Sequence, residues 1–139
     1  LTSTRWPHWT QGRPTPMPRL TRFDHGSIAV GDIDEAVVFY RDVLGLRPLP
    51  RPDFGFPGAW FDAGGTAVHL TTDGAQRGPD APVRPNEAHL AFQVDDPDAM
   101  IERLKVNGVN AEELPDSPAA RRQVFFNDPW GNMLEMIEF

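Results

Sequence analysis

Four side chains suited to metal binding stand in two pairs along this sequence. His25 is followed 44 residues later by His69, and His89 is followed 46 residues later by Glu135. Three imidazoles and one carboxylate suit Fe(II), Mn(II), Co(II), Ni(II) or Zn(II), and they need no thiolate. Such a set would leave one or two positions open on an octahedral ion. With neutral imidazoles, a divalent ion and one carboxylate give a local charge of +1, which favours an oxyanionic or chelating substrate.

The two pairs belong to an internal repeat. The segment HGSIAVGDID, which begins at His25, is similar to HLAFQVDDPD, which begins at His89, with an offset of 64. A second match, at an offset of 66, aligns GTAVHL, which contains His69, with GNMLEM, which contains Glu135. Two pairs related by a twofold axis can converge on one point near that axis. The repeat therefore predicts one centre with three imidazoles and one carboxylate.

Each half of the repeat has the sequence pattern of one strand, one helix and three further strands. The halves are residues 22–73 and 87–139, and residues 74–86, rich in Gly and Pro, form the linker. A short apolar run opens each half, and an Asp cluster then stands where a helix needs its N-cap. The expected first strands are 27–30 and 90–94, the helices follow and end near Gly45 and Gly108, and the later strands are 46–50, 58–63, 66–72, 109–114, 122–127 and 132–138.

A half of about fifty residues cannot bury both faces of its own strands, so the two halves must pair. The expected fold is α+β, with two pseudo-symmetric βαβββ modules whose mixed sheets curl into a cup around a central metal site. A helix covers the outside of each module. The concave face of the cup is the natural place for a site.

The composition excludes several classes of protein. The 139 residues include no Cys, which excludes a disulfide framework, a thiolate metal site and a Cys nucleophile. No apolar run is long enough to span a bilayer. The net charge of −7 argues against nucleic acid as the main partner. We therefore expect a cytoplasmic protein with a small-molecule substrate and with neither a membrane nor a nucleic acid as partner.

The charge is unevenly distributed along the chain. Residues 1–22 carry four Arg and no acidic residue, so the rest of the chain has a balance of −11. Residues 1–21 also hold four Pro and two Trp, which favours an extended arm without a regular helix. They lack the apolar segment of a secretory signal. This basic arm is either a flexible tail or an arm whose Trp side chains pack on a partner subunit or over the mouth of a site.

Several motifs carry a resemblance to a known family. The pattern His25-x4-Val30-x-Asp32, followed by FYRDVLGL, resembles the opening of a vicinal oxygen chelate protein. This is the glyoxalase, bleomycin-resistance and extradiol-dioxygenase superfamily. HLAFQVD and FNDPWGNMLE resemble its second module, so the resemblance covers residues 22–139 as a single domain. It implies paired βαβββ modules that form a cup, usually in homodimers, with a divalent metal at the centre. The ligand positions of that family match His25, His69, His89 and Glu135.

The residue at position 69 departs from one branch of the family. In glyoxalase I-like members the matching residue is typically Glu, which is both a ligand and a candidate base. In dioxygenase-like members two His and one Glu hold the metal, which matches His25, His89 and Glu135. His69 is then either a fourth ligand or a nearby acid–base group. The candidate catalytic residues are His69 and Glu135.

Aromatic and basic residues near the expected site have a less specific role. Trp60, Phe54, Phe56, Phe125 and Phe126 are expected in the core or in a pocket wall. Arg121 and Arg122 are expected to be solvated, although one of them could bind a substrate carboxylate or phosphate.

Two functions fit these observations. The first is a metal-dependent enzyme of lyase, isomerase, epimerase or dioxygenase type that acts on a small chelating substrate, with the metal as a Lewis acid or as the site of O2 activation. The second is a protein that binds and sequesters a drug or metabolite without catalysis, as bleomycin-resistance members do. The acidic body would then suit a cationic ligand.

Overall fold

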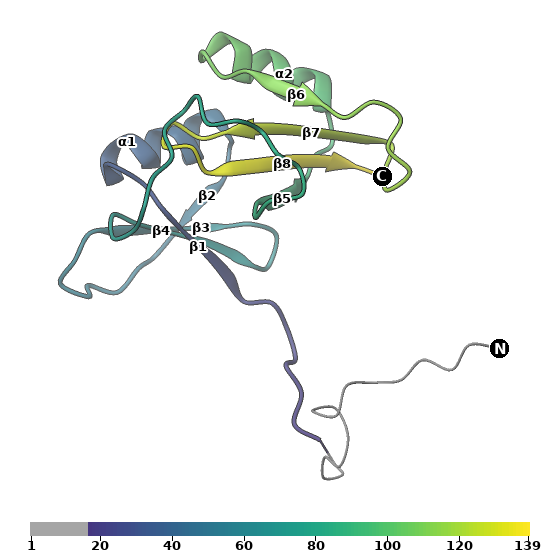
Figure 1. Ribbon diagram of the computed structural model, residues 1–139. Coiled ribbons are helices and arrows are strands. Elements are labelled where there is room, and N and C mark those ends of the chain that lie inside the picture. Colours follow the sequence, from purple (N-terminus) through teal and green to yellow (C-terminus); the bar gives the residue numbers. More distant parts are fainter. Residues whose placement is uncertain (1–16) are drawn as a thin grey trace.

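The strands form two separate four-stranded sheets in the computed structural model, which describes residues 17–139 (Figure 1). Most of the expected basic arm, residues 1–16, lies outside the described residues. In the first sheet the strands are ordered β1-β4-β3-β2, with bounds β1 His25–Ala29, β2 Arg47–Leu49, β3 Gly58–Asp62 and β4 Ala67–Thr71. In the second they are ordered β5-β8-β7-β6, with bounds β5 Leu90–Gln93, β6 Ala111–Glu113, β7 Arg122–Asn127 and β8 Met133–Glu138.

The two sheets have the same topology and the same register. In each, the first strand pairs in parallel with the last, and the remaining pairs are antiparallel. Ser27 lies opposite His69 in the first sheet, and Ala91 lies opposite Glu135 in the second. Ser27 and Ala91 each come two residues after the first His of their repeat. The predicted α+β fold with two βαβββ modules is confirmed, and the sheets do not close into a barrel.

The first helix differs from the expected single helix. It begins as α1 (Ile33–Val37), with Asp32 as N-cap accepting a 2.8 Å hydrogen bond from the amide of Glu35. It continues as the π-helix η2 (Val38–Val43), in which the amide of Leu44 bonds the carbonyl of Phe39. The wider winding accommodates three buried side chains, those of Phe39, Tyr40 and Val43.

The second helix agrees with the expectation from the sequence. Helix α2 (Pro97–Val106) has Asp96 as N-cap and Pro97 in its first turn. Gly108 follows its end with a φ of 77°, and Gly45 follows the first helix with the same value. A positive φ is strained for a residue with a Cβ, so glycine suits both chain reversals.

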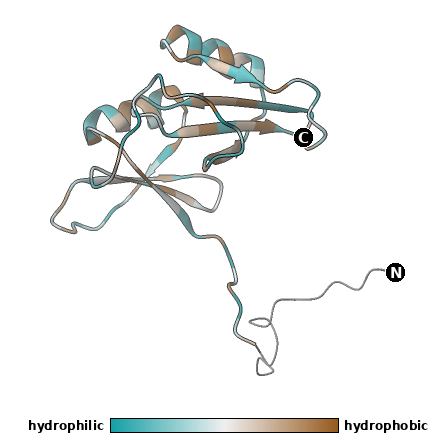
Figure 2. Cartoon of the chain, viewed as in Figure 1, coloured by the Kyte–Doolittle hydropathy of each residue, from teal (hydrophilic) through white to brown (hydrophobic). Residues whose placement is uncertain are grey.

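One hydrophobic core joins the two modules. Its fully buried members come from both, among them Val30 and Phe61 from the first and Leu104, Val124 and Leu134 from the second. Figure 2 shows apolar residues within β7 and β8, which are the inner strands of the second sheet. Within residues 17–139, no helix is both long and apolar enough to cross a membrane.

Candidate metal centre

His25 and His69 lie against each other on one face of the first sheet. Their ring centroids are 3.9 Å apart and the rings are nearly parallel, at 14°. The other face of the His69 ring stacks on Trp60 at 4.2 Å and 8°. The strand register explains this arrangement, because Ser27, His69 and Trp60 lie opposite one another on adjacent strands, and His25 precedes Ser27 by two residues.

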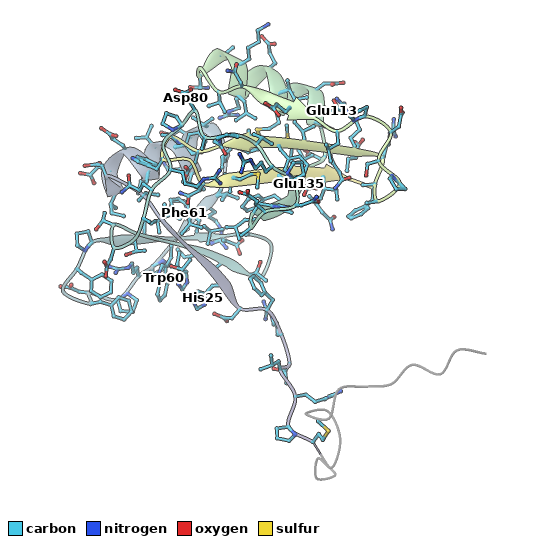
Figure 3. All side chains as sticks on the ribbon, in the orientation of Figure 1. His25, Trp60, Phe61, Asp80, Glu113 and Glu135 are labelled. Atoms are coloured by element: carbon cyan, nitrogen blue, oxygen red, sulfur yellow. The ribbon has the colours of Figure 1, made fainter. Side chains whose placement is uncertain are left out.

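This face of the first sheet points away from the second sheet. Side chains alternate along β3, so Phe61 is fully buried in the core while its neighbour Trp60 lies on the opposite face. Figure 3 shows Trp60 and His25 on the side away from β7 and β8, with Phe61 on the side that faces them. An open groove of about 1090 Å³ runs over the outward face, lined also by Leu49, Arg51, Phe54, Phe56 and Thr71.

The second pair is in direct contact. Nε2 of His89 lies 3.0 Å from Oε1 of Glu135, whose residue is only 4% exposed. Gln123 donates a 3.0 Å hydrogen bond from Nε2 to the other oxygen, Oε2, and itself contacts the hydroxyl of Ser117. The edge of the His89 ring packs on Phe125, which lies opposite Glu135 on β7. Both oxygens of the buried carboxylate therefore have a partner.

The first His of each module is oriented through its Nδ1 atom. Nδ1 of His25 donates to Oδ2 of Asp24 at 2.8 Å, and Nδ1 of His89 donates to the carbonyl of Glu87 at 2.7 Å. Metal-binding His residues usually donate their second ring N–H to a carboxylate or carbonyl in this way. In this arrangement Nε2 of His25 is left for an ion, whereas Nε2 of His89 faces Oε1 of Glu135.

The surroundings of His69 lower its pKa and so favour the neutral form of its ring. Desolvation lowers the pKa of His69, and the charge that His25 carries when protonated lowers it further, while Asp24 opposes the shift. The hydrogen bond from His25 lowers the pKa of the Asp24 carboxyl, which remains ionised. A neutral imidazole has a free lone pair, so His69 can bind an ion or accept a proton.

One chain brings the four predicted residues together only as two pairs. Across residues 17–139, no three or more His, Asp or Glu side chains are grouped so that they could hold one ion. The pairs line different cavities: His25 and His69 line the outward groove, while His89 and Glu135 line a cavity of about 770 Å³ between the modules. The reason is that the first pair faces away from the second module.

Two residues of this region were not predicted from the sequence. Gln123 bonds the carboxylate of Glu135, and its position two residues before Phe125, on the same face of β7, was the available signal. Arg51 lies in the groove, but it follows β2 in an irregular segment that has no repeat equivalent to mark it.

The two arginines considered as substrate ligands have other partners. Arg122 makes 2.8 Å hydrogen bonds to Glu113 and Asp98, and these two acidic residues raise its pKa. Arg121 lies 3.5 Å from Glu138. Neither arginine lines the groove or the cavity between the modules. The high exposure of Arg121 agrees with the expected solvated charge, and substrate binding by either arginine stays a prediction.

The repeated βαβββ topology and the paired His and Glu side chains define a glyoxalase-like protein. The chain belongs to the Glyoxalase/Bleomycin resistance protein/Dioxygenase superfamily, whose family model matches residues 22–136. Members of this superfamily typically use a divalent metal ion and bind small-molecule substrates. The family assignment made from the sequence motifs is confirmed.

Individual relatives are named for different activities. It is 29% identical over 122 residues to Glyoxylase I 4 of Arabidopsis thaliana, covering 84% of this chain and 70% of the relative. It is 31% identical over 127 residues to lactoylglutathione lyase of Haemophilus influenzae, covering 82% and 90%. A fosfomycin resistance protein from Listeria monocytogenes has the same fold, with a TM-score of 0.71, 19% identity and coverage of 86% and 91%.

Proposed function

We propose that this protein is a divalent-metal-dependent enzyme of the glyoxalase type, acting on a small substrate that presents one or two oxygens to the metal. The family assignment and the similarity to a lactoylglutathione lyase support this class of function. The observation that carries the proposal is the 3.0 Å approach of Nε2 of His89 to Oε1 of Glu135.

Either a proton or a metal ion between the two atoms accounts for that approach. The carbonyl of Glu87 can only accept a hydrogen bond, so Nδ1 of His89 carries the proton and Nε2 of a neutral ring carries a lone pair. An ionised Glu135 also presents only lone pairs. Two acceptors at this distance need a proton or a metal ion to bridge them.

We propose further that the complete centre is shared between two copies of the chain. Because His25 and His69 face away from their own second module, the His89 and Glu135 that complete their site come from a second copy. A homodimer then holds two equivalent centres, each with three imidazoles and one carboxylate. Dimers are common in the superfamily.

The residues around the ligands have defined tasks in this scheme. A divalent ion held there would supply Lewis-acid stabilisation of an enolate or oxyanion, or O2 activation if it is Fe(II). Gln123 holds the buried Glu135 in place, and Asp24 and the carbonyl of Glu87 orient the two His rings. His69, neutral and stacked between His25 and Trp60, either completes the ligand set or accepts a proton from the substrate. Trp60 excludes water from one side of the His69 ring.

Metal analysis tests the proposal. Protein purified without oxygen is expected to contain about one divalent ion per chain, and His89→Ala or Glu135→Ala should remove it. The matched control is His8→Ala, because His8 is the one histidine outside the proposed ligand set. A parent protein that is metal-free and does not respond to added divalent ions would contradict the proposal.

A second candidate function is the binding of an aromatic drug or metabolite without catalysis. It is favoured by one observation: Phe54 and Phe56 are 50% and 55% exposed beside Trp60 and offer a stacking surface. A thermal-shift screen separates the two functions. Divalent ions should raise Tm if the protein is the metal-dependent enzyme, whereas only aromatic compounds should raise it if the protein sequesters them.

A further inference from the structure

Five rings form a continuous row across the groove of the first sheet. His25 stacks on His69 at 3.9 Å, and His69 stacks on Trp60 at 4.2 Å. Trp60 lies 6.0 Å from Phe54, and Phe54 lies 5.7 Å from Phe56. The row begins at the first ligand pair and ends in the segment between β2 and β3. A flat, apolar molecule in contact with the ligand pair can therefore extend along Trp60 and Phe54.

A guanidinium stands at the far end of this row. The central carbon of the Arg51 guanidinium lies 4.9 Å from the ring centre of Phe54 and 5.1 Å from that of Phe56. Its Nη1 donates a 3.2 Å hydrogen bond to the carbonyl of Phe56. These contacts fix the guanidinium while leaving Nη2 and Nε as donors for another group.

Arg51 has no acidic partner in the part of the chain that the structure describes. It makes no ion pair within residues 17–139, and residues 1–16 contain no Asp or Glu that could provide one. Two of the acidic residues that line the groove are already paired, Asp24 with His25 and Asp62 with Arg47. The third, Asp73, lies in the exposed segment after β4. The charge of Arg51 is therefore free to meet an anionic group of a ligand in the groove.

Gly58 makes room for this guanidinium. A Cβ at residue 58 would lie 2.7 Å from the guanidinium carbon of Arg51. Gly58 does not have a positive φ, so its backbone suits other residues. The replacement Gly58→Ala should therefore displace the end of the Arg51 side chain, keeping both its charge and the local backbone.

We propose that Arg51 selects substrates that carry an anionic group on a flat, apolar body, with the body on Trp60 and Phe54 and the anionic group on the guanidinium. This inference rests on the proposed function, because the reacting oxygens of the same substrate would lie at the ligand pair at the other end of the row. A carboxylate that accepts two hydrogen bonds from one guanidinium matches the two remaining donors.

The test uses 1-naphthoate and its uncharged counterpart 1-naphthylmethanol as probes, with binding measured by calorimetry. The parent protein should bind 1-naphthoate more tightly than 1-naphthylmethanol. Arg51→Gln and Gly58→Ala should each weaken the binding of 1-naphthoate about fivefold to tenfold, as expected for one charge-assisted contact. Neither replacement should change the binding of 1-naphthylmethanol. The control is Arg41→Gln, which removes the same charge from an arginine paired with Asp42 on η2. It should leave both probes unaffected.

The inference is overturned if the parent binds both probes equally, or if Arg51→Gln changes 1-naphthoate binding no more than Arg41→Gln does. It is also overturned if Arg51→Gln tightens 1-naphthoate binding. Titrations with and without added Zn²⁺, together with the metal content of each variant, separate this inference from the proposed function. Selectivity for 1-naphthoate in a protein that binds no metal would contradict the proposed function alone.

Discussion

The hydroxyl of Tyr40 donates a 2.7 Å hydrogen bond to Oδ2 of Asp128, and the two residues belong to different modules. Both are fully buried. The carboxylate of Asp128 also accepts hydrogen bonds from the amides of Trp130 and Asn132, so it organises the turn between β7 and β8. Desolvation and the negative charge of Asp128 raise the pKa of Tyr40 well above its usual value, which keeps the hydroxyl protonated as a donor. This contact holds η2 against the second module.

Removal of the Tyr40 hydroxyl should destabilise the fold. Tyr40→Phe removes one donor to a buried carboxylate, and we expect the free energy of unfolding to fall by about 1 to 3 kcal/mol. Asp128→Ala should cost more, because it leaves the Tyr40 hydroxyl and two amides without their acceptor. Urea unfolding measures both changes. Equal stability of Tyr40→Phe and the parent would show that the bond does not hold the modules together.

Gln123 should affect the metal without affecting the fold. Gln123→Leu removes the donor to Oε2 of Glu135, and loss of such a partner typically lowers metal affinity by about 10- to 100-fold. Competition with a chromophoric chelator measures the affinity. The control is Gln93→Leu, because Gln93 is an exposed residue of β5 in the same sheet. If Gln123→Leu and Gln93→Leu bind the metal with equal affinity, Gln123 does not support the metal site.

Two glycines with similar backbones should differ in their tolerance of a side chain. Gly131 and Gly78 have φ of 86° and 84°, so alanine is strained at both. A Cβ at Gly131 would also lie 2.2 Å from the carbonyl oxygen of Gly78, whereas a Cβ at Gly78 meets nothing within 4 Å. We expect Gly131→Ala to cost at least about 1 kcal/mol more than Gly78→Ala in urea unfolding. A cost that is the same for both would mean that the linker does not pack on this turn.

The ion pairs of Arg122 should stabilise the protein only above acidic pH. Arg122 lowers the pKa of Glu113 below its usual value of 4.5, so Glu113 stabilises the fold above that value and loses this contribution as pH falls through its folded-state pKa. Because Glu113 is partly exposed, we expect Arg122→Gln to lower the free energy of unfolding only slightly at neutral pH. The difference from the parent should shrink below pH 4.5.

Arg121→Gln provides the control for this pH series. The Arg121 side chain is 76% exposed and lies 3.5 Å from Glu138, whereas the Arg122 side chain is 24% exposed. The replacement Arg121→Gln should change the free energy of unfolding little at any pH. If the cost of Arg122→Gln stayed constant down to pH 3.5, the Glu113 contact would not be the source of the stabilisation.

The sequence was most informative where local chemistry decides the structure. Asp32 and Asp96 mark the two helix starts because an N-cap needs a side-chain acceptor, and the structure has both caps. The repeat placed His69 and Glu135 at equivalent positions. The strand register agrees, because His69 lies opposite Ser27 and Glu135 lies opposite Ala91.

The rest depends on contacts between distant residues. The π winding after Val37 depends on how Phe39 and Tyr40 pack in the core, which periodicity along the chain does not determine. His25 and His69 lie on one face of the first sheet. The direction of that face depends on how the two modules pack together, and no local sequence pattern encodes it. The same holds for Arg51, whose position depends on two rings and on the space above Gly58.

We propose that each metal centre takes His25 and His69 from one chain and His89 and Glu135 from another. The direct measurement is the metal content of a mixed dimer, isolated through two different affinity tags. One chain carries His25→Ala with His69→Ala, and the other carries His89→Ala with Glu135→Ala. If the centres are shared, each mixed dimer has one intact centre and binds about one ion, whereas dimers of either variant alone bind none. Mixed dimers that contain no more metal than dimers of either variant alone would contradict shared centres.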